Sequence, residues 1–152
     1  MSRPNRNGRR SKKTLLARSK GRKLKTKKAA PQAAQAKRTA QRIAKAVSDK
    51  GAERVSVLDV RGVVGYTDYV VVCSVQSDRA ARAVADHVLE TMAAAGHRAF
   101  VTEGYDTASW ILLDFSDVIT HVFLPEARDF YDLDGLWIDA PKVTGWEVRS
   151  EK

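Results

Sequence analysis

Residues 110–124 form two apolar-rich runs that are separated by only two polar residues. The first run is WILLDF at 110–115, the connection is Ser116-Asp117, and the second run is VITHVFL at 118–124. Two such runs joined by two residues are typical of a β-hairpin with a minimal turn. The pattern therefore predicts two antiparallel strands, and we expect the rest of the fold to be organised around them.

The short turn also predicts which side chains share a face of the hairpin. With residues 115 and 118 opposite each other, alternation along both strands puts six residues on one face: Trp110, Leu112, Asp114, Ile119, His121 and Phe123. The opposite face is ordinary core material. A face that mixes tryptophan, aspartate and histidine with apolar residues is unusual for a surface that only packs. We interpret it as a candidate binding face.

Shorter patterns predict the other elements of the fold. Apolar residues at helical spacing indicate helices at about 32–50 and 77–95, and Ser77 or Asp78 is suited to cap the second. Three further strands and a final helix are predicted at 55–60, 68–75, 98–102 and 125–137. This order predicts an α/β fold, with a mixed β-sheet of about five strands and helices packed on it.

Charge divides the chain into two parts. Residues 1–48 hold 17 Lys and Arg and no acidic residue, so the other 10 basic and all 18 acidic residues fall in 49–152, which has a net charge of −8. We predict three segments. They are a basic extension over 1–31 that is disordered on its own, a domain over 32–140, and a loose C-terminal tail over 141–152.

The basic extension is suited to a phosphate backbone, because counterion release favours sequence-independent binding by clustered lysines and arginines. The candidate RNA-contacting residues are Arg9, Arg10, Lys12, Lys13, Lys23, Lys25, Lys27 and Lys28. A solvated tail without a specific target is the alternative. No aromatic residue lies among these charges, so the pattern predicts no sequence preference.

Cysteine content and hydropathy bear on the compartment. Cys73 is the only cysteine, so we expect no intrachain disulfide and a reducing, cytoplasmic environment. No apolar run has the roughly 18–20 residues that a membrane span needs, and the N-terminus lacks the apolar stretch of a signal peptide. The acid-free start leaves an organellar transit peptide as an alternative, although Leu15, Leu16 and Leu24 make a poor amphipathic stripe.

Three aspartates near predicted strands raise a metal-dependent nucleotide-handling enzyme as an alternative function: Asp59, Asp68 and Asp114. No Gly-rich loop followed by Lys and Ser or Thr supports it, and no Asp-x-Asp pair lies on a strand. Cys73 in an apolar strand is a poor nucleophile, and no serine elbow motif is present. We therefore predict no catalytic residue, no metal site and no cofactor.

Aromatic and acidic residues gather in the hairpin face and the final helix. Aromatic anchors with a charged rim are typical of protein–protein interfaces, and an acidic rim favours a basic partner. The predicted partner-binding residues are Trp110, Asp114, His121, Phe123, Tyr131, Asp134 and Trp137. In the alternative interpretation, the final helix packs on the hairpin and the aromatic side chains cover one another.

Several short motifs occur together in one order along the chain. They are LDV at 58–60, TDY at 67–69, EG at 103–104, Trp110, LD at 113–114, HVF at 121–123, EAR at 126–128, FY at 130–131 and LW at 136–137. In this order and spacing, over about residues 35–139, the chain resembles the ribosomal silencing factor (Iojap) family. Ser109 and Asp134 depart from the family pattern, where Asp and Glu are usual, and either change would soften an acidic contact.

The resemblance implies a fold related to nucleotidyltransferases but without their catalytic motifs. It also implies a translational repressor that binds ribosomal protein L fourteen on the large ribosomal subunit. Bound there, such a protein sterically blocks joining of the small subunit when nutrients are scarce. Family members are often dimers when free, so the resemblance also implies a homodimer.

Overall fold

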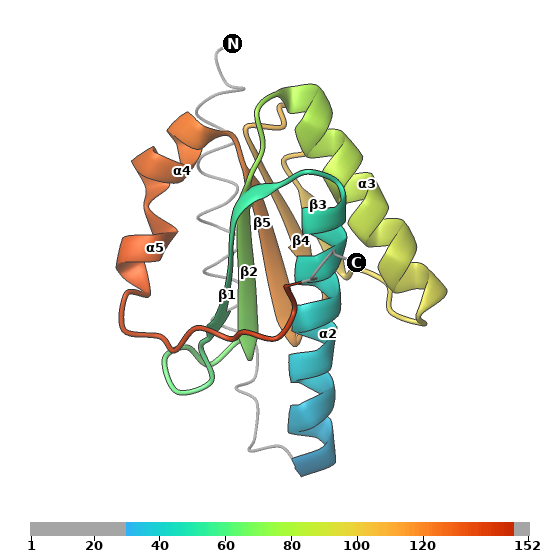
Figure 1. Ribbon diagram of the computed structural model, residues 1–152, viewed down its shortest axis with the longest axis vertical. Coiled ribbons are helices and arrows are strands. Elements are labelled where there is room, and N and C mark those ends of the chain that lie inside the picture. The colour runs from blue at the N-terminus through green and yellow to red at the C-terminus, as the bar shows by residue number, and fades with distance from the viewer. Residues whose placement is uncertain (1–29, 148–152) are drawn as a thin grey trace.

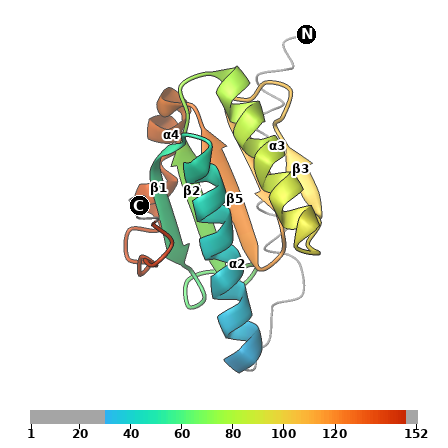
Figure 2. The same cartoon turned by 45° about the vertical axis from the view of Figure 1, so that its right-hand side comes forward.

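A mixed five-stranded sheet lies between two layers of helices in the computed structural model, which describes residues 30–147 (Figure 1). The elements are α2 (Ala30–Asp49), β1 (Glu53–Asp59), β2 (Tyr69–Ser74), α3 (Asp78–Ala94), β3 (Val101–Glu103), β4 (Trp110–Asp114), β5 (Val118–Phe123), α4 (Pro125–Tyr131) and α5 (Leu133–Leu136). Helices α2 and α3 cover one face of the sheet, and α4 and α5 lie against the other (Figures 1 and 2). The predicted fold class, a mixed sheet of five strands with helices packed on it, is confirmed.

The sheet has the strand order β1-β2-β5-β4-β3. Strands β2 and β5 run parallel, and the other three neighbouring pairs are antiparallel. The β4–β5 hairpin has the predicted register, since Trp110 pairs with Phe123 and Asp114 pairs with Ile119. Its two-residue turn needs a left-handed residue at Ser116, where φ is 77°, and the Ser116 amide donates to Asp114 Oδ1 at 2.7 Å.

Aliphatic side chains fill the layer between the sheet and the α2–α3 pair. Helix α2 turns a narrow alanine-rich stripe inward, including Ala36, Ala40 and Ala44, which lets the helix lie close to the strands. Helix α3 begins where predicted, because the Ser77 side chain accepts a hydrogen bond from the Ala80 amide at 3.0 Å. Cys73 of β2 is fully buried in this layer.

The final helix differs from the prediction because it is broken in two. Asp132 has a left-handed φ of 48°, which cannot continue an α-helix, and its side chain accepts from the Gly135 amide to start α5. The break turns α5 so that Leu133 and Trp137 face the sheet, whereas Leu136 faces solvent. The prediction of one continuous helix over 125–137 is therefore wrong, because the structure has two short helices there.

Residues 141–147 also differ from the expected loose tail. Pro141 O accepts from the Asp59 amide and Val143 N donates to Val57 O, both at 2.8 Å, so this segment continues the sheet beyond β1. Trp146 is half-buried against the α2 side of the core. Two apolar residues were too weak a pattern to predict this edge pairing. Residues 1–29 of the basic extension, and the end of the tail at 148–152, lie outside the described residues, whereas residues 30 and 31 begin α2 and are not part of a disordered segment.

Candidate functional site

Five rings from the hairpin and the α4–α5 region form a continuous aromatic cluster. The Trp110 ring centroid lies 5.0 Å from that of Phe123 and 4.4 Å from that of Tyr131. The His121 ring joins Trp110 to Trp137, at 5.8 and 6.3 Å. We refer to these five residues as the aromatic cluster. The hairpin register brings Trp110, His121 and Phe123 together, and the α4–α5 region supplies Tyr131 and Trp137.

Burial in this cluster corrects the simple docking prediction. Trp110 is 4% exposed, Trp137 is 5% exposed, and His121 and Phe123 are 0% exposed. Side chains so deeply buried are not available for a partner to touch in this conformation. The alternative interpretation of the sequence, that aromatic side chains cover one another, describes their arrangement. Tyr131 is half-buried at the margin of the cluster.

A hydrogen bond orients the histidine inside the cluster. Trp110 Nε1–H donates to His121 Nδ1 at 2.9 Å. Because that nitrogen accepts, the imidazole is in the neutral tautomer that carries its proton on Nε2. A buried indole N–H without a partner would cost free energy, so Trp110 and His121 are matched as a pair across the two strands.

The two predicted acidic contacts have structural roles within the fold. Asp114 is 2% exposed and accepts from the turn amide of Ser116. Asp134 receives two hydrogen bonds from the Arg128 guanidinium, Nε to Oδ2 and Nη2 to Oδ1, each at 3.0 Å. These charge-assisted bonds hold the pKa of Asp134 below its usual range.

Arg128 was not predicted as a site residue, yet it joins α4 to three other elements. Its side chain is 3% exposed. Besides Asp134, it donates through Nη1 to the Arg54 carbonyl at 2.6 Å and to Ser74 Oγ at 3.0 Å. The Arg54 carbonyl is reachable because a bulge interrupts β1 there, with φ of 51°. Arg128 thus fixes α4 and α5 to one end of the sheet.

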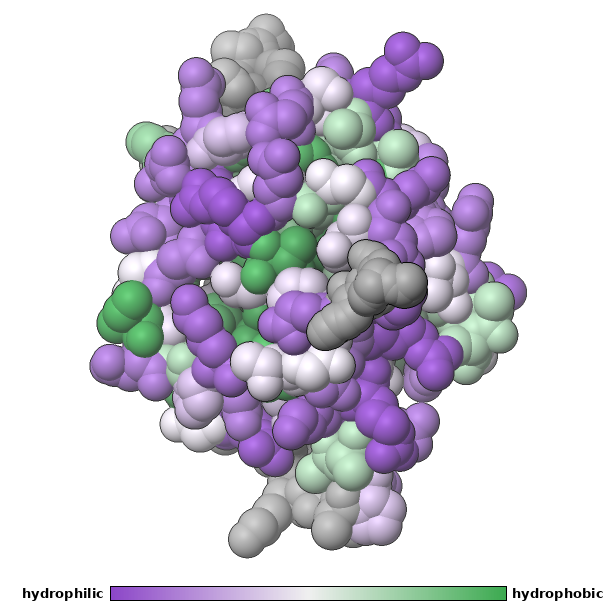
Figure 3. All heavy atoms as spheres, viewed as in Figure 1, coloured by the Kyte–Doolittle hydropathy of each residue, from purple (hydrophilic) through white to green (hydrophobic). Residues whose placement is uncertain are grey.

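Three large apolar side chains remain exposed on the outside of this region. Phe130 is 64% exposed, Leu136 is 65% exposed and Ile138 is 73% exposed. Exposed aspartates lie among them in the chain, at Asp129, Asp132 and Asp139. We call these six residues the α4–α5 surface. Isolated apolar side chains appear at the corresponding margin of the molecule among polar ones (Figure 3).

The α4–α5 surface was only partly predictable. The acidic rim follows from the sequence, and Phe130 belongs to the predicted aromatic helix. Leu136 and Ile138 were not predicted as surface residues. In the single continuous helix that we predicted, nothing distinguished them from Leu133 and Trp137, which face inward. The sequence DLDGLWID at 132–139 does contain the distinguishing pattern. Leu133 and Trp137 are an i, i+4 pair that faces inward, which leaves Leu136 and Ile138 outside.

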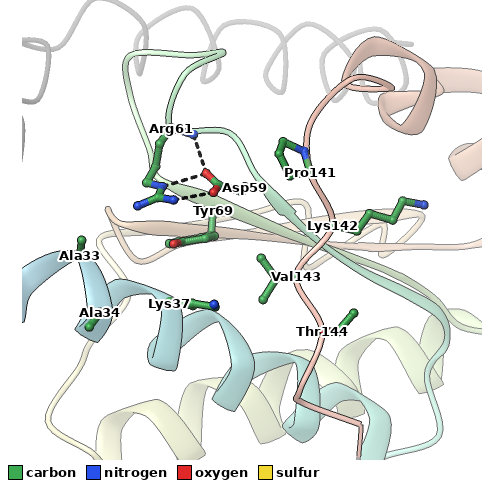
Figure 4. Close-up of a pocket in the computed structure, with 10 residues that line it drawn as sticks. All are labelled: Ala33, Ala34, Lys37, Asp59, Arg61, Tyr69, Pro141, Lys142, Val143 and Thr144. Atoms are coloured by element: carbon green, nitrogen blue, oxygen red, sulfur yellow. Dashed lines mark hydrogen bonds and ion pairs between the residues drawn. The ribbon is translucent and has the colours of Figure 1, made fainter. Parts of the chain in front are cut away.

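A separate pocket of about 390 Å³ lies between α2, Tyr69 and residues 141–144. In Figure 4, Lys37 points across it, whereas Lys142 points away from it. Arg61 is held by Asp59 in a bidentate ion pair at 2.7 and 2.9 Å, which lowers the pKa of the Asp59 carboxyl. Asp59 therefore neutralises the charge of Arg61 in this pocket.

The three aspartates of the enzyme alternative occupy separate structural settings. Asp59 pairs with Arg61, Asp114 caps the hairpin turn, and Asp68 is buried in the loop before β2. Within residues 30–147, no group of three His, Cys, Asp or Glu side chains is arranged to hold a metal ion. Burial raises the pKa of the Cys73 thiol to about 12. Within the same range, no helix is long and apolar enough to cross a membrane.

Comparison with known proteins gives the family. A family model described as "Ribosomal silencing factor during starvation" matches residues 32–152. The chain belongs to the ribosomal silencing factor family. This membership confirms the resemblance seen in the motifs, and the match includes the residues that pair with β1.

Relatives of the ribosomal silencing factor family support this assignment. Ribosomal silencing factor RsfS of Bacillus subtilis is 38% identical over 98 residues, which cover 64% of this chain and 83% of that protein. A mouse protein named "Mitochondrial assembly of ribosomal large subunit protein 1" is 31% identical over 91 residues, 58% of this chain and 40% of the mouse protein. A Chromobacterium violaceum crystal structure, at 27% identity, has a TM-score of 0.65 and covers 76% of this chain and 94% of that one.

Proposed function

We propose that this protein represses translation by binding the large ribosomal subunit and sterically blocking the small subunit from joining. Membership of the ribosomal silencing factor family supports a ribosomal partner. The name of the mouse relative associates that protein with the large subunit. The mechanism is obstruction, which needs a stable docking surface and no chemical step.

The α4–α5 surface is the observation that carries this proposal. Residues 30–147 contain 12 basic and 17 acidic side chains, so the described domain has a net charge of −5. The aspartates around the α4–α5 surface repel a phosphate backbone at that surface, whereas they attract a basic ribosomal protein. Exposed Phe130, Leu136 and Ile138 supply the apolar anchors, and the neighbouring aspartates supply the complementary rim. The partner is ribosomal protein L fourteen.

The seven predicted partner-binding residues divide into two groups in this proposal. Tyr131 lies at the margin of the α4–α5 surface and contacts the partner directly. The buried members Trp110, Asp114, His121, Phe123 and Trp137 support that surface from beneath, and the partly exposed Asp134 supports it through its pair with Arg128. Substitutions among them would weaken docking by displacing α4 and α5 rather than by removing a contact atom.

Subunit joining tests the proposed function directly. Purified large and small subunits are mixed at a magnesium concentration that supports association, and the joined fraction is followed by light scattering or gradient sedimentation. We expect the protein to lower the joined fraction and to sediment with isolated large subunits. Undiminished joining at saturating protein, or sedimentation with small subunits alone, would contradict the proposal.

A cross-linking or pull-down measurement tests the partner separately. We expect isolated ribosomal protein L fourteen to bind the protein, and binding to weaken as salt screens the opposite charges. An unrelated basic ribosomal protein of similar charge serves as the control. Equal binding to both would show charge attraction without a specific docking site.

The basic extension adds a second contact in this proposal, to ribosomal RNA beside the docking site. A linked second contact raises the effective concentration at the first. Substituting glutamine for the eight candidate residues between Arg9 and Lys28 should weaken large-subunit binding mainly at low salt. Equal affinity of the substituted and native chains at every salt concentration would reject this role.

A homodimer is the proposed state of the free protein. Its apolar α4–α5 surface would be covered by a second copy until the ribosome competes for it. Sedimentation equilibrium over a range of protein concentrations tests this state. A molecular mass that stays at 16.8 kDa throughout would contradict it.

A further inference from the structure

Helix α2 carries a basic stripe on the side that faces away from the sheet. Arg38, Arg42 and Lys45 repeat at the i, i+4, i+7 spacing of this outer helix face, and Lys37 lies on the flank of the helix, at the edge of the pocket beside Tyr69. All four side chains are exposed. Successive arginines are about 6 Å apart along the axis. The stripe is local, because the described domain as a whole is acidic.

Ion pairing within the domain leaves most of this stripe uncompensated. Lys45 pairs with Asp49 at 2.9 Å, at the C-terminal end of the helix. Among the described residues, Lys37, Arg38 and Arg42 have no ion-pair or hydrogen-bond partner. We call these three residues the α2 stripe. Lys37 adds only a longer-range attraction to Asp59, whose main partner is Arg61, and Arg38 and Arg42 make no ion pair within the described domain.

The chemistry around the α2 stripe distinguishes among anionic partners. The exposed large apolar side chains of the described domain lie at Val63, Phe100, Phe130, Leu136 and Ile138, all outside α2. An acidic protein interface or a membrane surface needs apolar anchors beside the charges. A sugar–phosphate backbone needs only cations at suitable spacing.

We propose that the α2 stripe binds the phosphate backbone of ribosomal RNA. This inference rests on the proposed function, which brings the protein to the large subunit. It adds a second RNA contact on the folded domain, distinct from the basic extension. The stripe continues the positive charge of residues 1–28, which contain 13 Lys and Arg and no acid.

The position of α2 predicts how such a contact would act. Helix α2 lies on the opposite layer from α4 and α5 (Figures 1 and 2). RNA that reaches the α2 stripe is therefore beside the docked domain, not beneath its α4–α5 surface. Contacts on two layers would fix the orientation of the domain between a basic protein and an RNA strand.

The small pocket next to α2 does not explain the stripe. Lys37 lines its edge, but Arg61 is neutralised by Asp59 and Lys142 points away (Figure 4). Arg38 and Arg42 are not among the residues that line it. An extended polyanion along the helix accounts for all three cations, whereas a small anion in the pocket would engage one.

Matched charge variants of the full chain test the inference. The first variant combines Lys37→Gln, Arg38→Gln and Arg42→Gln, and glutamine preserves helix propensity. The control combines Lys50→Gln, Arg79→Gln and Arg98→Gln, three exposed cations elsewhere that also lack a partner among the described residues. Both variants lose the same charge, so only its location differs. Circular dichroism and thermal unfolding check that both remain folded.

Affinity is measured as a function of salt for two ligands: isolated large subunits and protein-free large-subunit RNA. Three lost phosphate contacts should reduce the slope of log affinity against log salt by about 2–3 for the stripe variant. We expect this reduction for both ligands, with a much smaller change in the control. Equal slopes for the two variants would overturn the inference and leave the proposed function standing.

The second ligand separates the remaining outcomes. A stripe effect on intact subunits without one on protein-free RNA would identify an acidic protein partner and overturn the RNA assignment. Failure of the native chain to bind large subunits would contradict the proposed function. In that case the protein-free RNA measurement still decides whether the α2 stripe binds a phosphate backbone.

Discussion

The two faces of the sheet are built from different chemistry. Under α2 and α3, the strands present aliphatic side chains such as Val71, Ile111 and Val122. Against α4 and α5, they present the aromatic cluster with its internal hydrogen bond, and Arg128 fixes those helices at the end of the sheet. The first face needs only shape and volume, whereas the second depends on matched polar partners.

The two faces therefore have different roles: the aliphatic face contributes stability, whereas the aromatic face also determines where α4 and α5 lie. Aliphatic packing tolerates substitutions that preserve volume, so it does not dictate what lies outside the helices. The polar and aromatic face holds α4 and α5 in one position through directional contacts. The α4–α5 surface exists only when both helices are held in that position. We therefore expect buried residues on this face of the sheet to affect partner binding as well as folding.

Removing the central ring of the aromatic cluster should have the largest effect. Trp110→Ala is expected to destabilise the fold by about 3–5 kcal/mol, because it opens a cavity in the aromatic cluster. Urea unfolding measures the change, with Trp110→Phe as the control that keeps a ring but loses the bond to His121. A folded Trp110→Ala variant with native stability would mark Trp110 as an exposed contact and not as core.

The Arg128–Asp134 pair should have the next largest effect. Arg128→Met is expected to cost about 2–3 kcal/mol, because Asp134, Ser74 and the Arg54 carbonyl lose their donor. Asp134→Asn should cost less, since that side chain is 35% exposed. A double-mutant cycle measures the coupling, and strictly additive effects would show that the two residues stabilise the fold independently.

The same pair predicts a pH dependence of stability. The folded-state pKa of Asp134 lies below its unfolded value, so its contribution is complete above the unfolded pKa near 4. That contribution is lost as the pH falls through the lower, folded-state value. We expect Asp134→Asn to flatten the acid limb of the stability curve, and Asp59 to maintain a residual slope through its pair with Arg61. If Asp134→Asn left the acid limb of the stability curve unchanged, the ion pair between Asp134 and Arg128 would not contribute to stability as expected.

A helix cap on the aliphatic face should have a smaller effect. Ser77→Ala removes the acceptor for the Ala80 amide and is expected to cost about 1 kcal/mol. Ser77→Asp is the matched control, because aspartate also caps helices. Thermal unfolding distinguishes them, and equal losses in both variants would show that the cap is unimportant.

Cys73 reports on the aliphatic face without a substitution. Its burial and raised pKa predict that thiol reagents label it only after the core opens. The labelling rate in increasing urea should therefore follow unfolding. Rapid labelling of the native protein would show that the α2–α3 face opens locally.

The hairpin shows how far the sequence predicts this molecule. Turn length and alternation determine the register of Trp110, Leu112 and Asp114 correctly, because both are local properties. Alternation assigns a side chain to a face but does not say what covers that face. The burial of Trp110 depends on Tyr131 at the end of α4 and on Trp137, which reaches the sheet only after the chain turns at Asp132.

The α4–α5 region shows where sequence-based prediction fails. The bond between Arg128 and Asp134 spans six residues and a left-handed break, so no helical spacing indicates it. The acceptor carbonyl of Arg54 depends on a strand bulge 74 residues away. Interactions of this kind are tertiary, and the sequence pattern contained only the residue types that make them.

Subunit joining with surface variants tests the central claim most directly. Phe130→Ser with Leu136→Ser removes two exposed anchors from the α4–α5 surface, while Val63→Ser with Phe100→Ser removes exposed apolar side chains elsewhere. We expect all variants to fold, the control to inhibit joining like the native protein, and the first variant to need at least about tenfold more protein, as the loss of two anchor residues implies. Equal inhibition by both variants would contradict docking through the α4–α5 surface.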